Sequence, residues 1–180
     1  MFNWFPKIII RLKGGIAMSE NCESTIVQDS YYLISLFNEG NKPITQLIVQ
    51  KLMYFFEAYY MNKENKDKLY DCPFKAWTFG PVAMPLYEKY RCFGSSKIFL
   101  TDKEINEGNN ICDKKKEILK EIYVFFGDYT AMQLVNLTHM QGSPWYRKWE
   151  ENNCRIVYGD ESNIDKLETK EWFKDKFISE

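Results

Sequence analysis

The sequence has few of the residues on which catalytic and metal sites depend. Its only histidine is His139, and its five cysteines lie far apart with no CxxC pair. A structural zinc ion needs about four nitrogen or sulfur ligands, which usually come in closely spaced pairs. No glycine-rich GxxxxGKS/T or GxGxxG loop is present to bind phosphate groups. We therefore expect no metal and no cofactor, and we expect the thiols to be free in a reducing cytoplasm.

The sequence also lacks an excess of charge and a long hydrophobic run. Its 24 Lys and Arg residues nearly balance 25 Asp and Glu residues, so no overall field attracts nucleic acid or an anionic membrane. The apolar run 8–10 is much shorter than the roughly 20 residues of a membrane span. Arg11 and Lys13 interrupt the pattern of a secretion signal. We expect a cytoplasmic protein without a membrane partner, and we do not expect a nucleic-acid partner. The basic run 114–116 is typical of a solvated helix face.

The chain has the size of one domain, preceded by a short segment of different character. Its 180 residues are 45% hydrophobic and 17% aromatic, which is enough to build one substantial core. The codons of Lys13, Gly14 and Gly15 can form a bacterial ribosome-binding sequence just before Met18. We therefore expect residues 1–17 to be a disordered extension or to precede the true start of translation. Residues 18–180 are expected to form one domain.

A helix that is apolar on almost every side is predicted between residues 45 and 61. Its main apolar stripe follows helical spacing and consists of Ile48, Leu52, Phe55 and Tyr59. A helix that is apolar all round must be enclosed, so we expect this one at the centre of the domain. Gln46, Gln50 and Glu57 form its one polar line, and Lys51 lies beside them. Thr45 is the expected N-cap.

The remaining pattern predicts a mainly α fold, a compact single-domain bundle of about six helices with a possible small β-hairpin. The other predicted helices cover residues 25–38, from about 85, 114–126 with Asp113 as N-cap, 130–140, 145–150 and from about 169. Residues 69–78 and 95–100 are the candidate strands of the hairpin. Residues 104–113 are expected to form a loop, and residues 155–158 an extended stretch.

The most specific stretch runs from Ala76 to Val82. Trp77 and Phe79 are expected on one side of an extended chain, with a sharp turn at Gly80, which lacks the Cβ that would clash with the ring of Pro81. On these residues alone, the stretch is a well-packed turn. We expect Trp77→Ala to cost about 3–5 kcal/mol of stability if the indole is buried.

Three separated motifs occur in an order that resembles the Panacea domain. They are QKLMYFFEAYY from Gln50, AWTFGPVAMPLYEKY from Ala76 and LTHMQGSPWYRKW from Leu137. The resemblance covers about residues 25–149, and the family includes SocA-like antitoxins and phage-associated proteins. The motif residues that carry over are Gln50, Lys51, Leu52, Tyr54, Trp77, Gly80, Pro81, Val82, Tyr87, His139, Pro144 and Trp145.

The resemblance implies a bacterial, non-catalytic antitoxin that neutralises a partner toxin by direct protein contact. It also implies, for some members, a role as adaptor that delivers the toxin to a protease. We expect the toxin to be encoded by an adjacent gene. Tyrosines are common anchors of protein interfaces, and those close to the motifs are candidates for a contact patch: Tyr54, Tyr59, Tyr60, Tyr87 and Tyr90.

Two alternatives to the antitoxin remain open at this stage. One is a phage- or prophage-encoded regulator that binds nucleic acid. The other is a hydrolase in which His139 activates Cys72, Cys154 or Ser143, since a nucleophile needs an adjacent base.

Overall fold

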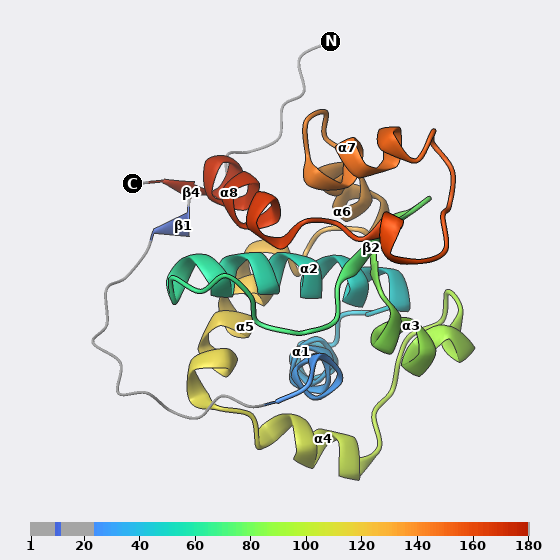
Figure 1. The fold of residues 1–180 in the computed structure, drawn as a ribbon. Coiled ribbons are helices and arrows are strands. Elements are labelled where there is room, and N and C mark those ends of the chain that lie inside the picture. The colour runs from blue at the N-terminus through green and yellow to red at the C-terminus, as the bar shows by residue number, and fades with distance from the viewer. Residues whose placement is uncertain (1–9, 12–23, 180) are drawn as a thin grey trace.

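The computed structural model describes residues 10–11 and 24–179, and these form a mainly helical fold with two small sheets (Figure 1). The predicted fold class is confirmed. The expected N-terminal extension lies outside the described residues, apart from one short strand, and stays a prediction. In chain order the elements are β1 (Ile10–Arg11), α1 (Ile26–Glu39), α2 (Gln46–Lys63), β2 (Phe74–Trp77), β3 (Gly80–Ala83), α3 (Met84–Tyr90), η1 (Arg91–Phe93), α4 (Asp102–Asn109), α5 (Asp113–Phe126), α6 (Ala131–Thr138), α7 (Pro144–Glu151), η2 (Asp160–Ser162), α8 (Lys166–Phe177) and β4 (Ile178–Ser179).

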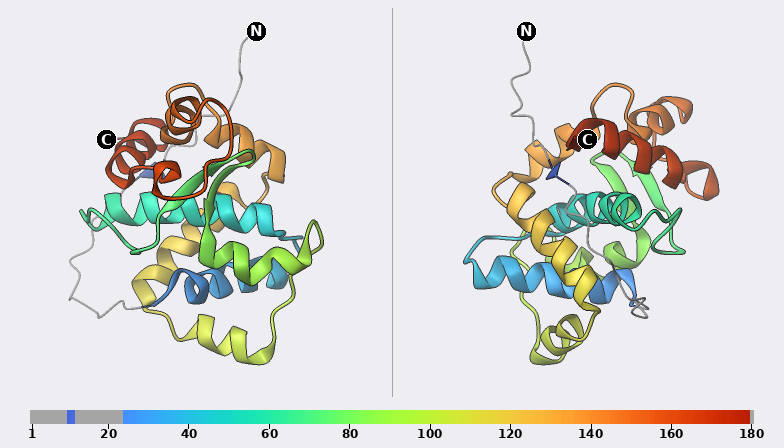
Figure 2. Two further views of the ribbon diagram at one scale, coloured as in Figure 1. Left: turned by 45° about the vertical axis from the view of Figure 1, so that its right-hand side comes forward. Right: turned by 90° about the vertical axis from the view of Figure 1, so that its left-hand side faces the viewer.

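Helix α2 is the enclosed centre of the molecule, as its all-round apolar pattern predicts. Every residue from Ile48 to Met61 is buried. The helix contacts α1, α3, α5, α6, α8 and β3. In Figures 1 and 2 it runs between a group formed by α1, α4 and α5 and a second group formed by α6, α7 and α8. The enclosed position means that the polar residues of α2 must find partners inside the protein.

The hairpin differs from the predicted one. Strand β2 pairs in antiparallel fashion with β3, from Phe74 opposite Ala83 to Trp77 opposite Gly80, so residues 95–100 are not its partner. Only Thr78 and Phe79 connect the two strands, and Gly80 has a φ of 95°. Such a short connection favours glycine, because other residues rarely adopt positive φ. The chain therefore doubles back immediately after Trp77.

The predicted loop at residues 104–113 is wrong, because residues 102–109 form α4. Thr101 and Glu104 make a capping box, in which the Thr101 side chain accepts from the Glu104 N–H and the Glu104 carboxylate accepts from the Thr101 N–H. Gly108 lies so close to α1 that an added Cβ would be 2.7 Å from the backbone nitrogen of Tyr32. Local capping and close packing on α1 thus outweigh the polar composition of this segment.

Several element boundaries also differ from those predicted. Thr45 is the N-cap of α2, as predicted, although its side chain makes no capping hydrogen bond. The N-cap of α5 is Cys112 rather than Asp113. Helix α8 begins at Lys166, before the expected position, because Asp165 accepts a hydrogen bond from the Glu168 N–H. The start of α3 at Met84 confirms the prediction. Residues 155–158 belong to no helix or strand.

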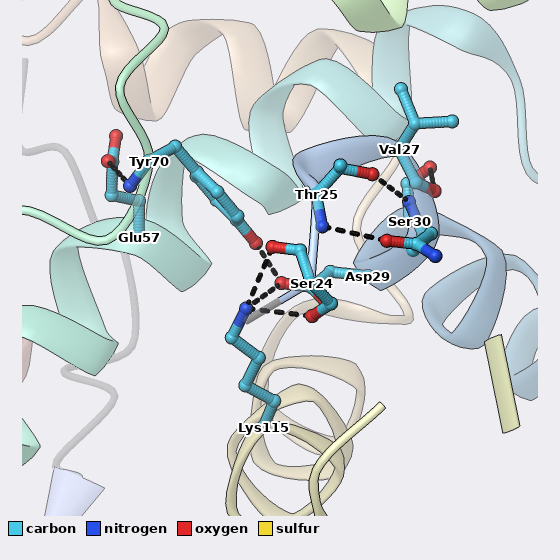
Figure 3. A network of polar contacts seen from close by, with 9 residues as sticks. Ser24, Thr25, Val27, Asp29, Ser30, Glu57, Tyr70 and Lys115 are labelled. Atoms are coloured by element: carbon cyan, nitrogen blue, oxygen red, sulfur yellow. Dashed lines mark hydrogen bonds and ion pairs between the residues drawn. The ribbon is translucent and has the colours of Figure 1, made fainter. Parts of the chain in front are cut away.

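A buried ion pair joins α1 to α5, as Figure 3 shows. The Lys115 ammonium lies 2.8 Å from the Asp29 carboxylate, and both side chains are almost completely buried. Lys115 also donates to the Ser24 hydroxyl at 2.8 Å, and the Tyr70 hydroxyl donates to Asp29. The expected solvated face at residues 114–116 is therefore wrong for Lys115. Helical spacing turns this residue toward α1, where a carboxylate compensates its charge.

The expectation of free thiols holds for some of the cysteines. Cys72, Cys92 and Cys154 are free, and the last two are exposed. Cys112, in contrast, is bonded in a disulfide. The expectation was therefore wrong for Cys112, which carries no local sequence signal such as a CxxC pair.

Candidate functional site

The three motifs come together around the β2–β3 hairpin. The first motif supplies Gln50 and Lys51 from α2, and the second forms the hairpin and α3. The third supplies His139, which follows α6, and Trp145 in α7. Strand β3 contacts both α2 and α6, while α7 contacts β2. Residues that are far apart in the sequence therefore form one continuous structure.

The side chains of Gln50 and Lys51 form hydrogen bonds with the backbone groups at the outer edge of β3. The Gln50 side-chain carbonyl accepts from the Ala83 N–H at 2.8 Å, and its amide donates to the Ala83 carbonyl at 3.2 Å. The Lys51 ammonium group donates to the Pro81 carbonyl at 2.7 Å. Pro81 has no N–H, so it leaves no unpaired donor at this edge. Side chains of α2 thus take the place of a neighbouring strand and fix the hairpin on the core.

Lys51 is completely buried, and the described residues provide no carboxylate within ion-pair distance. Burial lowers the pKa of Lys51 well below its ordinary value of 10.5, because a charged amine is poorly solvated inside the protein. Gly80 leaves the space for this side chain. An added Cβ would lie 2.8 Å from Lys51 Cε and 2.7 Å from Thr138 Oγ1. The close approach of these groups explains why the motif has glycine at this position.

His139 and Trp145 form a stacked pair beside the hairpin. Their ring centroids are 3.6 Å apart and the planes are inclined by 3°. The Trp145 indole N–H donates to the Trp77 carbonyl at 3.0 Å. Burial, with a further contribution from Lys51, lowers the pKa of His139 to about 4. The imidazole is therefore neutral at pH 7.

Ser143 and Pro144 set the direction of α7. The Ser143 hydroxyl accepts from the Tyr146 N–H at 3.0 Å and donates to the Thr138 carbonyl at 2.6 Å. Pro144 occupies the first turn of the helix, where its missing N–H costs nothing. This capping arrangement, which the sequence predicts, brings Trp145 against the hairpin.

An apolar surface, which we call the hairpin surface, lies on the outer side of the hairpin. It consists of Trp77, Phe79, Tyr87, Ile156 and Tyr158. Trp77 and Tyr87 are half-buried and meet edge to face, with ring centroids 5.1 Å apart. The exposed fractions are 58% for Phe79, 37% for Ile156 and 82% for Tyr158. Trp77 is thus partly exposed rather than a core residue, so Trp77→Ala should cost less than the 3–5 kcal/mol expected of a buried indole.

Two cavities share Trp77 and Tyr87 as walls. The first has a volume of about 350 Å³, and the second has a volume of about 460 Å³. The first is also bordered by Leu47, Phe79 and Ile156, and no charged residue lines it. The second is bordered by Val157 and Tyr158, with Lys75 as its one charged lining residue. The arrangement can receive apolar side chains on either side of the aromatic pair.

The other motif residues serve the core. Leu52, Tyr54 and Val82 are buried, although Val82 also borders the first cavity. The predicted contact patch of tyrosines is wrong for four of its five members, because they are buried: Tyr54, Tyr59, Tyr60 and Tyr90. Three of the four hydroxyls have internal partners. The Tyr54 hydroxyl bonds Thr169, the Tyr59 hydroxyl bonds Glu121, and the Tyr90 hydroxyl bonds Ser30. Burial of these phenols is therefore compatible with their polarity.

The exposed residues of the hairpin surface were not predicted from the sequence. Phe79 was expected on the same side of the chain as Trp77, and residues 155–158 were expected only to form an extended stretch. Phe79 is exposed because it stands at the tip of a two-residue turn. An apolar run between polar residues, such as 156–158, was the signal that could have pointed to a surface patch.

Among the described residues, no hydrogen bond joins His139 to Cys72, Cys154 or Ser143. His139 Nε2 has no hydrogen-bond partner, and Ser143 acts as a helix cap. No group of three His, Cys, Asp or Glu side chains in the described part of the chain could hold a metal ion. Across the same residues, no helix combines the length and the apolar character needed to cross a membrane.

The family model for the Antitoxin SocA-like, Panacea domain matches residues 49–146. The chain belongs to this family. It is 30% identical over 111 residues to Antitoxin SocA of Caulobacter vibrioides (strain NA1000 / CB15N). The alignment covers 57% of this chain and 58% of that protein, so the chain matches less than two thirds of the length of this Panacea relative. No solved structure matches. The matched region contains the hairpin and all the motif residues described above.

Proposed function

We propose that this Panacea protein is a non-catalytic antitoxin that neutralises a partner toxin by direct binding at the hairpin surface. The observation that carries the proposal is the exposed apolar cluster around Trp77 and Tyr87, with a cavity on each side. Exposed apolar patches and half-buried aromatic residues are typical of protein interfaces. The family relationship supports the same function.

A rigid support makes the hairpin surface suitable for tight binding. Gln50 and Lys51 bond the backbone of β3, and Trp145 bonds the backbone of β2. The part of the surface formed by Trp77, Phe79 and Tyr87 is therefore held in place before the partner arrives. Binding to such a surface loses less conformational entropy than binding to a mobile loop. On this proposal, the motif residues act mainly by positioning the anchors and only a few of them touch the toxin.

The toxin is proposed to be encoded by a gene adjacent to that of this protein and to act in the same cytoplasm. The test is to express each flanking gene from an inducible promoter in a bacterial host, with and without this protein. We expect one flanking gene to arrest growth and the intact chain to restore it. The absence of rescue for every toxic flanking gene contradicts the proposal.

Three substitutions then test the site and the mode of action. Phe79→Asp and Tyr87→Ala should abolish rescue while the melting temperature shows that the protein is folded. Val124→Asp is the matched control, because Val124 is 72% exposed on α5. His139→Phe keeps an aromatic ring against Trp145 and removes any acid–base chemistry. We expect it to retain rescue, whereas a hydrolase that uses His139 would lose activity.

The remaining expectations can be tested with the same strains. A proteolytic adaptor would shorten the half-life of the toxin, and the effect would vanish in a host that lacks the responsible protease. A nucleic-acid regulator would instead bind DNA with an affinity that falls steeply with salt. Neutralisation by direct contact requires neither proteolysis of the toxin nor binding to DNA.

A further inference from the structure

Residues 155–158 have a backbone without hydrogen bonds. Within the described part of the chain, none of their N–H groups donates and none of their carbonyl groups accepts a hydrogen bond. The segments on either side are bonded. The Cys154 N–H donates to Trp149, and the Gly159 carbonyl accepts from Lys75 at 2.6 Å. In Figure 1 this stretch forms an open connection between α7 and η2, beside β2.

The residues of this segment favour a β-strand. Ile156 and Val157 are β-branched and Tyr158 is aromatic, and these residue types are enriched in strands. Ile156 and Tyr158 are two positions apart and both are exposed, and in a strand such residues share one face. An exposed segment of this kind is a template for pairing with another chain, because its backbone groups lack partners.

The segment also borders both cavities. Ile156 lines the first cavity, whereas Val157 and Tyr158 line the second. A positively charged side chain lies at each end of the segment. Arg155 is exposed and has no ion-pair partner among the described residues. The Lys75 ammonium group bonds the Gly159 carbonyl and the Asn163 side-chain oxygen, and no carboxylate of the described residues pairs with it. An occupant should therefore carry apolar side chains in its middle and a carboxylate near its ends.

We propose that residues 155–158 bind an extended segment of the partner toxin by β-strand addition, with the apolar side chains of that segment entering the cavities beside Trp77 and Tyr87. This inference rests on the proposed function and specifies the partner: an extended, apolar segment with at least one acidic residue near an end. The backbone supplies the hydrogen bonds, and the two cavities select the side chains.

The test uses the full chain and the product of the flanking gene that it neutralises. Amide hydrogen exchange is measured for residues 155–158 in the free protein and in the complex. We expect fast exchange in the free protein and about a 100-fold or greater slowing in the complex at alternate residues of this segment, because only every second N–H faces an added strand. Val157→Pro, which removes one N–H, should weaken binding about tenfold or more. Val157→Ala, the matched control, keeps the backbone groups and should bind nearly as tightly as the unaltered chain.

The outcomes separate this inference from the function on which it rests. A complex that forms while the amides of residues 155–158 remain unprotected overturns the strand addition and leaves the antitoxin function standing. Failure of the unaltered chain to bind or to rescue overturns the proposed function and this inference together. The exchange measurement needs no variant, so it decides the matter even if Val157→Pro does not fold.

Discussion

Lys51 shows how a buried amine can be tolerated at a motif position. It donates to the Pro81 carbonyl, and no carboxylate of the described residues lies within ion-pair distance. Burial lowers its pKa well below 10.5, so the folded protein disfavours the charged form more than the unfolded chain does. The residue thus lowers the stability of the fold in exchange for a fixed position of β3.

We expect Lys51→Met to change how stability depends on pH. In the unaltered protein, the unfolded chain binds a proton at Lys51 that the folded protein releases. The free energy of unfolding should therefore rise with pH between the lowered pKa and 10.5, by up to about 1.4 kcal/mol per pH unit. Urea unfolding at pH 7, 8 and 9 measures this slope. It should be smaller in Lys51→Met, and identical slopes would show that Lys51 remains charged in the folded protein.

His139 should govern part of the loss of stability in acid. Its pKa is lowered from 6.5 to about 4. The contribution of the neutral imidazole to the free energy of unfolding is therefore fully present above pH 6.5 and is lost as the pH falls through 4. The shift corresponds to a loss of up to about 3 kcal/mol, less whatever solvent near the half-buried ring recovers. His139→Phe keeps an aromatic ring on Trp145 but cannot be protonated. Its melting temperature should fall less between pH 6.5 and 4 than that of the unaltered protein.

At the scale of elements, the ion pair between α1 and α5 determines which parts of these two helices contact each other. Asp29 and Lys115 compensate each other in the interior, and Tyr70 and Ser24 complete the hydrogen bonds. Such a pair adds little stability compared with a well-packed apolar pair, but removal of one partner leaves a buried charge. The pair therefore specifies the contact of the two helices more than it strengthens it.

We expect Asp29→Leu or Lys115→Met alone to cost about 3–5 kcal/mol, because each leaves the other charge unpaired. The double variant Asp29→Leu, Lys115→Met should recover most of this loss, since both charges are then absent. The free energies of unfolding in urea give the coupling between the two positions. Additive losses in the double variant would contradict the role of the pair as the determinant of this contact.

At the scale of the whole molecule, buried tyrosines limit stability in alkali. Burial is the main cause that raises the pKa of Tyr54, Tyr59, Tyr60, Tyr70 and Tyr90. An acid whose pKa is raised by folding stabilises the fold below its unfolded pKa and loses this contribution as the pH rises above it. For these tyrosines, the loss begins at about pH 10.

We therefore expect a cooperative alkaline transition above about pH 10, in which the tyrosines ionise as the protein unfolds. Circular dichroism measures the loss of helix, and tyrosinate absorbance measures ionisation in the same titration. The two curves should coincide for the buried residues. Ionisation of all the tyrosines before the helix signal changes would show that the phenols are accessible in the folded state.

The sequence predicted the elements whose patterns are local and strong. Helix α2, the N-cap at Ser143 and the start of α3 followed from helical spacing and from proline. It failed for α4 and for the partner of β2. Helix α4 forms from a polar segment because it is capped locally and packs on the distant α1. Strand β2 pairs with β3 rather than with residues 95–100, because the turn at Gly80 takes only two residues.

By itself, the sequence determined that α2 would be enclosed and that the chain carries three separated motifs. Apolar residues on every face of a helix allow no other position, and the motifs are read directly from the residues. Only the tertiary structure decided which aromatic residues are available to a partner. Tyr54 and Tyr59 are buried, whereas Phe79 and Tyr158 are exposed, because exposure depends on which distant segments cover a side chain, and local spacing does not record those contacts.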